Sequence, residues 1–329
     1  MPENKESKLV SNLTDLEKIE KIPTRFGYGE GIIEAGKKDE NIVVLCCDLT
    51  DSTRSAGFKE KFPKRFIQMS IMEQSLVSIA AGMAMAGKTP WVASYAMFCP
   101  GRAWEQVRTN MALNDTNVKI AGAHSGVSVG PDGATHQAIE DIAIMRVIPR
   151  MTVIAPADVF ETKKAVIAAS KMKGPCYVRF TREKTPVFTT KDTPFKIGKA
   201  NVLWDGDDVA IVACGPLVHN AILAAAELEK EKISVRVINM HTIKPLDEKT
   251  LLNAAKDCGA IVTLEEHQIN GGLGGAVCEF LSENHPVPVE RVGMRDCFGE
   301  SGKPEELIEH FGMGIGSIKE AIKKVIKRK

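Results

Sequence analysis

Apolar runs of strand length alternate along this chain with longer segments of helical period. Such alternation predicts parallel sheets covered by helices, because a helix is the usual connection between parallel strands. In the first half we expect strands at 42–48, 66–69, 91–94, 118–123, 151–155 and 176–180. Between them we expect helices at 74–86, 101–113, 135–146 and 159–172. These elements make up one complete α/β domain.

A second α/β run follows a segment, 181–208, that holds two prolines and several charges. Its expected strands are 209–214, 234–240, 260–265 and 288–292, and its expected helices are 217–231, 246–256, 273–284, 304–311 and 317–326. We place the domain boundary near residue 192, where periodicity is lost. The prediction is therefore an α/β protein of two consecutive parallel-sheet domains, 21–192 and 193–329, after a polar lead, 1–20, expected to be mobile.

Charge and composition argue against several classes of function. The 43 Lys and Arg residues nearly balance the 42 Asp and Glu residues, which leaves no strong field to attract nucleic acid or an anionic membrane. No apolar stretch is long enough to span a bilayer, and the charged N-terminus does not resemble a signal peptide. Eight scattered cysteines without a CxxC pair indicate free thiols in a reducing compartment. We therefore expect a cytoplasmic protein that binds neither nucleic acid nor membrane.

Familiar phosphate-binding and nucleophile motifs do not identify this chain. The pattern GxxxxGK[ST] occurs only at 82–89, where an expected helix (74–86) leads toward an expected strand (91–94), the reverse of the strand-to-helix order of a phosphate loop. GxSxG occurs only inside the glycine-rich loop at 122–141, and no GxGxxG follows a first strand. The string GGLGG at 271–275 fits neither phosphate-binding pattern, and we interpret it as a turn into a closely packed helix.

Three stretches hold residues suited to chemistry. In the first, IMEQS at 71–75, Glu73 opens a helix; it either stabilises the helix N-terminus or shares a proton with a ligand nitrogen. In the second, YAMF at 95–98, Tyr95 and Phe98 lie at a strand end, where they either fill the core or frame a flat heterocycle.

The third stretch is the glycine-rich loop at 122–141, which holds His124, Asp132 and His136 before an expected helix. Long loops with such residues usually serve a site. The twelve-residue separation of the histidines is unlike a zinc motif, so acid–base work or binding of an anionic polyol fits better than a metal. Alternatively, Thr135 caps the helix and the histidines are local hydrogen-bonding groups.

Groups suited to binding a phosphomonoester recur at element junctions. They are Arg25, Ser52 and Arg182. Arginine binds phosphate through two fixed donors, although each alone is equally consistent with an ordinary surface charge.

Taken in order, these motifs resemble the transketolase family of thiamine diphosphate enzymes, and specifically its C-terminal half. The resemblance covers about residues 20–325 and rests on eight strings, which are TR (24–25), DLTDS (48–52), ME (72–73), YAMF (95–98), HSGVSVGPDGATHQAIED (124–141), PAD (156–158), RFTREKTP (179–186) and IKPLD (243–247). It implies a thiamine diphosphate pyrimidine-binding domain followed by a transketolase C-terminal domain.

The resemblance also implies a role for each matched residue. Glu73 would hydrogen-bond the aminopyrimidine ring of the cofactor, Tyr95 and Phe98 would flank that ring, and Asp48 would lie near it. His136 would act near the carbonyl of the donor, and Asp132 would recognise a sugar hydroxyl. The sugar phosphate would be held by Arg25, Ser52, His124 and Arg182.

One part of the family pattern is absent. Full-length transketolases bind the diphosphate and Mg²⁺ through a GDG motif followed by an Asn, and nothing in this chain matches it; DGDD at 205–208 has no such Asn. The resemblance therefore implies one subunit of a split transketolase, in an α2β2 heterotetramer with an N-terminal subunit that holds Mg²⁺; this chain itself would hold no metal.

The implied reaction is ketol transfer from xylulose 5-phosphate to ribose 5-phosphate or erythrose 4-phosphate in the pentose phosphate pathway. The alternatives are a 1-deoxy-xylulose-5-phosphate synthase-like subunit, a 2-oxoacid dehydrogenase β-like subunit, and a scaffolding relative without catalysis. In the second domain, His267 beside Glu265 and Glu266 is either an interface cluster or an ordinary surface group.

Overall fold

The first part of the chain forms a seven-stranded sheet. The computed structural model describes residues 4–329, and in it this sheet has the strand order β12-β6-β7-β5-β4-β2-β3. Six of the strands are mutually parallel, and β12 pairs antiparallel with β6 at one edge. The strands are β2 (Ile42–Cys47), β3 (Phe66–Met69), β4 (Thr89–Tyr95), β5 (Lys119–Ala123), β6 (Thr152–Ile154), β7 (Cys176–Arg179) and β12 (Thr242–Lys244).

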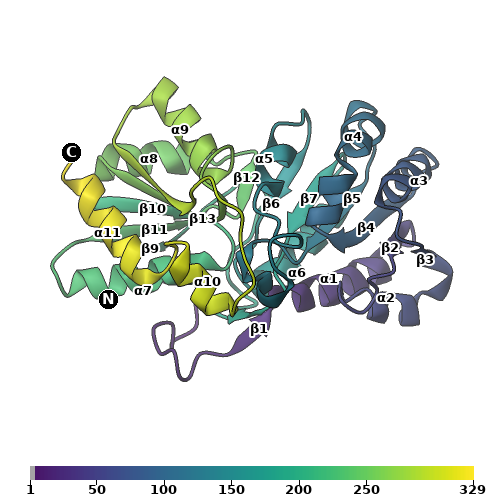
Figure 1. Ribbon diagram of the computed structural model, residues 1–329, viewed down its shortest axis with the longest axis horizontal. Coiled ribbons are helices and arrows are strands. Elements are labelled where there is room, and N and C mark those ends of the chain that lie inside the picture. Colours follow the sequence, from purple (N-terminus) through teal and green to yellow (C-terminus); the bar gives the residue numbers. More distant parts are fainter. Residues whose placement is uncertain (1–3) are drawn as a thin grey trace.

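Helices cover both faces of this sheet (Figure 1). One face packs against α1 (Thr24–Lys38), α2 (Ala56–Lys61) and α6 (Val159–Lys171). The other packs against α3 (Glu73–Met85), α4 (Trp104–Gln106) and α5 (Asp141–Arg146). Short helical turns lie at η1 (Lys5–Ser7), η2 (Pro63–Arg65), η3 (Met97–Arg102), η4 (Val107–Leu113) and η5 (Val127–Asp132).

The second part forms a five-stranded sheet of order β14-β13-β10-β11-β9, in which only β9 is antiparallel to its neighbour. Its strands are β9 (Asn201–Trp204), β10 (Val209–Ala213), β11 (Val235–Asn239), β13 (Ile261–Gln268) and β14 (Val289–Met294). Its helices are α7 (Leu217–Glu229), α8 (Glu248–Cys258), α9 (Leu273–Asn284), α10 (Pro304–His310) and α11 (Ile315–Ile326). The predicted α/β class with two consecutive domains is thereby confirmed.

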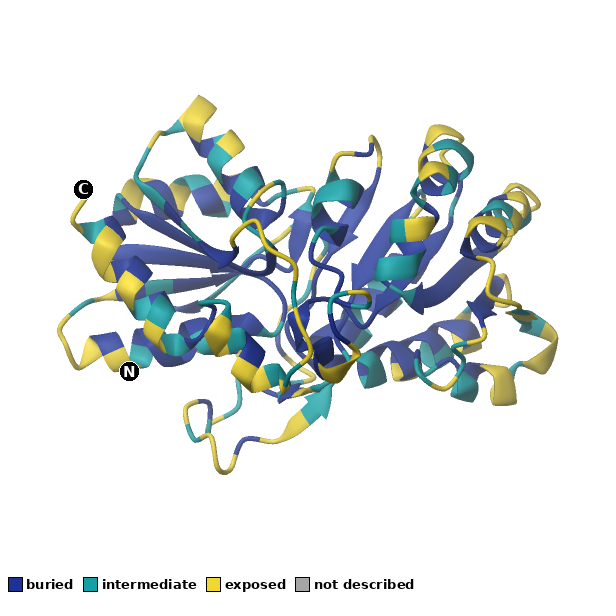
Figure 2. Cartoon of the chain, in the orientation of Figure 1, coloured by how far each residue is buried: buried dark blue, intermediate teal, exposed yellow. Residues whose placement is uncertain are grey.

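The central strands are buried on both faces, as sheets of this type require. Every residue of β2, β5 and β10 is buried, and Figure 2 shows the two sheets as dark interiors under helices whose outer surfaces are exposed. This explains why their sequences, such as IVVLCC, are apolar runs rather than alternating patterns.

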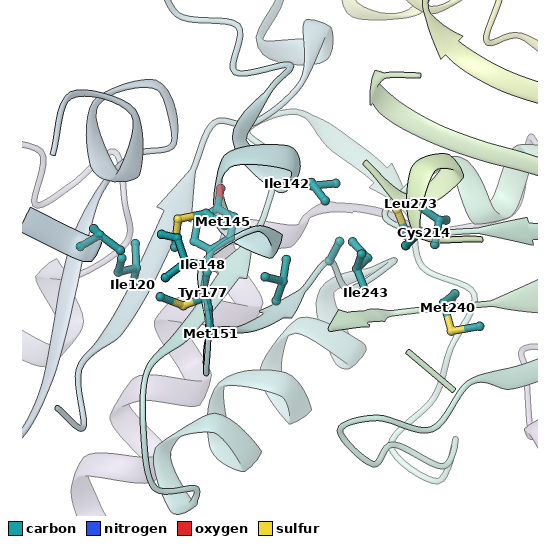
Figure 3. Packing of buried hydrophobic residues seen from close by; sticks show 14 of the residues in the cluster. Ile120, Ile142, Met145, Ile148, Met151, Tyr177, Cys214, Met240, Ile243 and Leu273 are labelled. Atoms are coloured by element: carbon teal, nitrogen blue, oxygen red, sulfur yellow. The ribbon is translucent and has the colours of Figure 1, made fainter. Parts of the chain in front are cut away.

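One hydrophobic core runs through both parts of the chain. Figure 3 shows Met145 and Tyr177 of the first domain in the same cluster as Met240, Ile243 and Leu273 of the second. Strand β12 adds to this connection, because residues of the second half complete the edge of the first sheet. The sequence did not indicate β12, which has only three residues and is followed by Pro245.

The predicted mobile lead is corrected for residues 4–20, which pack along the second domain; residues 1–3 lie outside the described residues. Leu13 and Ile19 are buried, and the Leu13 carbonyl lies 2.8 Å from Nε2 of His219 in α7. The lead ends in β1 (Lys21–Pro23), which pairs antiparallel with β8 (Lys184–Pro186).

Two predicted helices differ from the structure. The helix expected at 101–113 is present over 104–113 as α4 and η4, and a turn at Ala103, with φ of −99° and ψ of 15°, separates it from η3. The helix expected at 135–146 begins only at Asp141, so Thr135 does not cap it. Thr135 instead places its hydroxyl 2.9 Å from Nδ1 of His136.

Candidate functional site

Most of the predicted site residues lie at the carboxyl edge of the first sheet. Strand β2 ends just before Asp48, β4 ends at Tyr95 and β5 ends just before His124. Because these neighbouring strands are parallel, their carboxyl ends meet at one edge, where open α/β sheets bind ligands.

Four rings form a cluster at this edge. The imidazole of His124 stacks on Tyr95 with ring centroids 3.9 Å apart, and Phe98 lies 6.0 Å from Tyr95 in a nearly parallel orientation. The ring of His136 meets Phe98 edge-on at 5.3 Å. The structure therefore brings together residues that lie up to 41 positions apart in the sequence.

His124 is a neutral imidazole with a free nitrogen. Burial, with the nearby charges of Arg25, Arg182 and His136, lowers the pKa of its side chain to about 3. Its Nδ1 is buried and makes no hydrogen bond, and its backbone has φ of 56°. A buried polar atom without a partner is costly, so a ligand that hydrogen-bonds Nδ1 would stabilise this side chain.

Arginines surround this histidine. Arg25, in the first turn of α1, donates from Nη1 to the carbonyl oxygen of Ser52 at 3.1 Å, while its buried Nε has no partner. Burial, together with Arg54 and Arg182, lowers the pKa of Arg25. Cations that destabilise one another in this way are stabilised by a bound anion.

Arg182 and Asp132 meet across this site. Nη1 of Arg182 lies 2.9 Å from Oδ1 of Asp132 and 3.3 Å from the carbonyl oxygen of Val129. Both charged side chains are about one third exposed, so the ion pair remains open to exchange with a ligand.

Glu73 is the first residue of α3, and its side chain is only 2% exposed. Its Oε2 makes no hydrogen bond, and the closest cation, Nη1 of the largely exposed Arg102, lies 3.6 Å away. The helix N-terminus favours the negative charge. This carboxylate oxygen can therefore accept a proton or a hydrogen bond from a ligand.

Asp48 is a further predicted site residue at this edge of the sheet. It follows β2 with φ of 53°, is exposed, and accepts a hydrogen bond from Nε2 of Gln68 at 3.5 Å. Its predicted place near a cofactor stays a prediction.

The second domain supports the site more than the sequence indicated. Glu265, Glu266 and His267 are all buried, which corrects their interpretation as a surface group. The carboxylate of Glu265 accepts hydrogen bonds from the amides of Leu273 and Gly274 at the start of α9, so GGLGG is the closely packed turn that we predicted.

Sequence reasoning missed three residues here: Arg54, Arg102 and Glu266. The two arginines lie a few residues beyond the strings at 48–52 and 95–98, and only the fold shows that Arg54 approaches Arg25 and that Arg102 approaches Glu73. Glu266 contacts Ser128, 138 positions earlier, and no local pattern could have revealed that contact.

Residues 4–329 contain neither a cluster of metal-binding side chains nor a helix suited to crossing a membrane. No cluster of three or more His, Cys, Asp or Glu side chains there has the arrangement of a metal site. In the same residues, no helix has the length and apolarity that a membrane crossing requires.

Comparison with protein-family models identifies both domains. The family model described as "Transketolase, pyrimidine binding domain" matches residues 20–187, and the one described as "Transketolase, C-terminal domain" matches residues 198–318. Our predicted boundary at 192 falls between these two ranges.

Similar proteins are found among both whole and partial transketolases. The transketolase C-terminal section of Methanocaldococcus jannaschii is 44% identical over 307 residues, which is 92% of this chain and 96% of that protein. The 6-deoxy-6-sulfo-D-fructose transketolase subunit SqwH of Clostridium sp. is 39% identical, over 95% of this chain and 97% of that subunit. The human transketolase is 37% identical, and the match covers 94% of this chain but only 50% of the human protein.

A solved structure described as "Split gene transketolase, inactive beta4 tetramer" superposes with a TM-score of 0.88 and 43% identity, over 94% of this chain and 99% of the other. The chain therefore belongs to the transketolase family, in which it is similar to the C-terminal section of split transketolases.

Proposed function

We propose that this chain is the C-terminal subunit of a split transketolase that, with an N-terminal subunit, transfers a two-carbon ketol unit between sugar phosphates. The proposed donor is xylulose 5-phosphate, the acceptors are ribose 5-phosphate and erythrose 4-phosphate, and the setting is the pentose phosphate pathway of the cytoplasm. The observation that supports this most directly is the buried Oε2 of Glu73 at the start of α3, which accepts no hydrogen bond from the described residues.

The two transketolase domains imply dependence on thiamine diphosphate, and the residues present fit its aminopyrimidine half. When bound, the cofactor stabilises the negative charge that develops as the bond beside the donor carbonyl breaks. Glu73 would accept a hydrogen bond from the ring nitrogen and share its proton. The faces of Tyr95 and Phe98 would border the ring, and Asp48 would lie near it. The partner subunit would hold the diphosphate and Mg²⁺.

The arginine cluster fits the phosphate end of the substrate. Arg25, Arg182, Ser52 and His124 would hold the anionic group, and the mutual repulsion among Arg25, Arg54 and Arg182 supports this assignment. Asp132 would accept a hydrogen bond from a sugar hydroxyl while still paired with Arg182. His136, beside Phe98, would move a proton near the donor carbonyl.

The expected assembly is an α2β2 heterotetramer with an N-terminal transketolase subunit. The similar chain described as an inactive tetramer of β subunits supports the view that such a subunit does not act alone. Neither the synthase-like nor the 2-oxoacid-dehydrogenase-like alternative explains the two histidines and Asp132 as well, because these groups suit a polyol better than a short oxoacid.

A second candidate function is ketol transfer from a donor ketose other than xylulose 5-phosphate. The relatives described as subunits of 6-deoxy-6-sulfo-D-fructose transketolase and apulose-4-phosphate transketolase are 39% and 38% identical to this chain. Sulfonate and phosphate are both tetrahedral oxyanions, so an arginine cluster can bind either.

The test is ketol transfer from xylulose 5-phosphate to ribose 5-phosphate in the presence of thiamine diphosphate and Mg²⁺. The chain alone is compared with the chain mixed with a candidate N-terminal subunit, after sizing has shown that the two assemble. Activity only in the mixture supports the proposal. Activity with 6-deoxy-6-sulfo-D-fructose but not with xylulose 5-phosphate selects the second candidate, and activity of the chain alone contradicts the split arrangement.

A further inference from the structure

The loop that holds Asp132 and His136 is hydrogen-bonded to the second domain. Oε1 of Glu266, at the end of β13, accepts a hydrogen bond from the backbone amide of Ser128 at 2.6 Å. Glu266 is only 2% exposed, and burial raises the pKa of its carboxyl group, with Arg179 and Ser128 opposing that effect. A buried carboxylate that accepts a backbone N–H in this way fixes the position of that peptide.

Gln137 hydrogen-bonds both within the same loop and to the second domain. Its Nε2 lies 3.0 Å from the carbonyl oxygen of Val127, and it also donates to the carbonyl oxygen of Glu300 at 2.9 Å. The first contact closes the loop, and the second joins it to residues 299–304 before and at the start of α10.

The glycines of the loop fit closely against these two parts of the second domain. At Gly126, with φ of 82°, a Cβ would lie 2.2 Å from Oε1 of Glu266. At Gly133, with φ of 74°, a Cβ would lie 2.7 Å from Oγ of Ser301. The loop therefore approaches the second domain more closely than a residue with a side chain would allow.

Glu266 is itself held in place from the first domain. Nη2 of Arg179 donates to the backbone oxygen of Glu266 at 2.7 Å, and Nε of Arg179 pairs with Asp141 at 2.8 Å. The OH of Tyr177 donates to the same carboxylate oxygen of Asp141 at 2.6 Å. This buried network fixes β13 relative to β7, so the backbone that bears the Glu266 carboxylate is held rigidly.

We propose that Glu266 is a positioning residue: by holding the amide of Ser128, the second domain sets where Asp132 and His136 stand in the site. The inference rests on the proposed function and extends it, because it gives a domain without apparent chemistry of its own a direct part in donor binding.

The test uses the assembled holoenzyme with Glu266→Ala, Glu266→Gln and a control, Glu265→Ala. Glu265 is a neighbouring buried carboxylate that holds α9 and not the loop. We expect Glu266→Ala to raise the KM for the donor about tenfold or more. Glu266→Gln, which keeps an acceptor for the Ser128 amide, should restore the KM to within about threefold of wild type. Glu265→Ala should lower the unfolding temperature but leave the KM within about twofold.

Hydrogen exchange of the Ser128 amide gives a readout that does not need activity. It should be faster in Glu266→Ala than in Glu265→Ala, because only the first loses the acceptor. Equal exchange rates, or an unchanged donor KM in Glu266→Ala, would overturn the inference. If the wild-type assembly transfers no ketol group, the proposed function fails, and the exchange comparison alone decides whether Glu266 positions the loop.

Discussion

The imidazole of His124 lies against the phenol ring of Tyr95, with 3.9 Å between ring centroids and 23° between planes. The two residues come from the ends of the adjacent strands β5 and β4, so sheet geometry alone places them together. A neutral, stacked imidazole among arginines can hydrogen-bond an anion without adding a titrating charge near neutral pH. This pair connects the proposed aminopyrimidine side of the site to the proposed phosphate side.

Replacing Glu73 by glutamine should abolish most activity while preserving the fold. Glutamine has nearly the same shape but cannot take up and return a proton, and such proton sharing contributes about 10²- to 10⁴-fold to rates. We expect kcat for ketol transfer to fall at least about 100-fold in the assembled enzyme. Glu60→Gln, at an exposed position of α2, is the matched control. A Glu73→Gln enzyme within a few-fold of wild type would refute the proton-sharing role.

Replacing Arg182 by alanine should weaken binding of anionic sugars selectively. The change removes one arginine of the cationic cluster and leaves Asp132 without its ion-pair partner. The KM for phosphorylated donors should rise about tenfold or more, which corresponds to about 1.4 kcal/mol, while the KM for unphosphorylated analogues changes little. Arg295→Ala, a largely exposed position in the second domain, serves as control. Equal effects on both kinds of sugar would rule out the phosphate assignment.

The buried His241 should make folding stability depend on pH. Burial lowers the pKa of its imidazole to about 4, below the ordinary value of 6.5. Between these values the unfolded chain binds the proton and the folded chain does not, so the free energy of unfolding falls as the pH drops below 6.5. This one group contributes at most about 1.4 kcal/mol per pH unit.

In the wild type, the ring centroids of His241 and Phe195 lie 4.3 Å apart. The variant His241→Phe keeps a ring in this place but removes the group that takes up a proton. Urea unfolding at several pH values between 7.5 and 4.5 should therefore give a smaller acid-side loss of stability for the variant than for wild type. Parallel curves for the two proteins would show that His241 is protonated as readily in the folded chain as in the unfolded one.

Two glycine-to-alanine changes should shift stability in opposite directions. At Gly122 in β5 a Cβ would lie 2.3 Å from the ring of Tyr177, so Gly122→Ala should destabilise the protein by about 1–3 kcal/mol through overpacking. At Gly82, exposed in α3, nothing lies within 4 Å, and Gly82→Ala should stabilise by about 0.5–1 kcal/mol. Thermal unfolding of both variants tests the pair, and a shift of the same sign in both would contradict it.

The sequence predicted the elements that rest on strong patterns. Apolar runs such as IVVLCC have the length of buried strands, and the structure places strands there. It failed where local signals misled, as at Thr135, which looks like a helix cap although the chain continues as a loop to Asp141. Short strands such as β12 and β8 have three residues each, too few to show a period.

The candidate site likewise has residues that the sequence could predict and contacts that it could not. Its residues could be picked out because they lie within motifs at strand ends, where parallel topology brings them together. The contact between Glu266 and Ser128 could not, since it joins residues 138 positions apart and depends on how the two domains pack. That Oε2 of Glu73 accepts no hydrogen bond from the described residues likewise follows from burial, which no local pattern specifies.

Strand β12 also limits how this polypeptide can be divided. Residues 242–244 complete a sheet otherwise built from residues 42–179, so a break at the domain boundary would leave that sheet with an unpaired edge at β6. Splitting the gene at that point would separate β12 from β6, and an exchange of second domains between relatives would have to preserve this strand pairing. The connection gives a topological reason for the two domains to be inherited as one unit, as they are in the similar section from Methanocaldococcus jannaschii, 96% of whose length this chain matches.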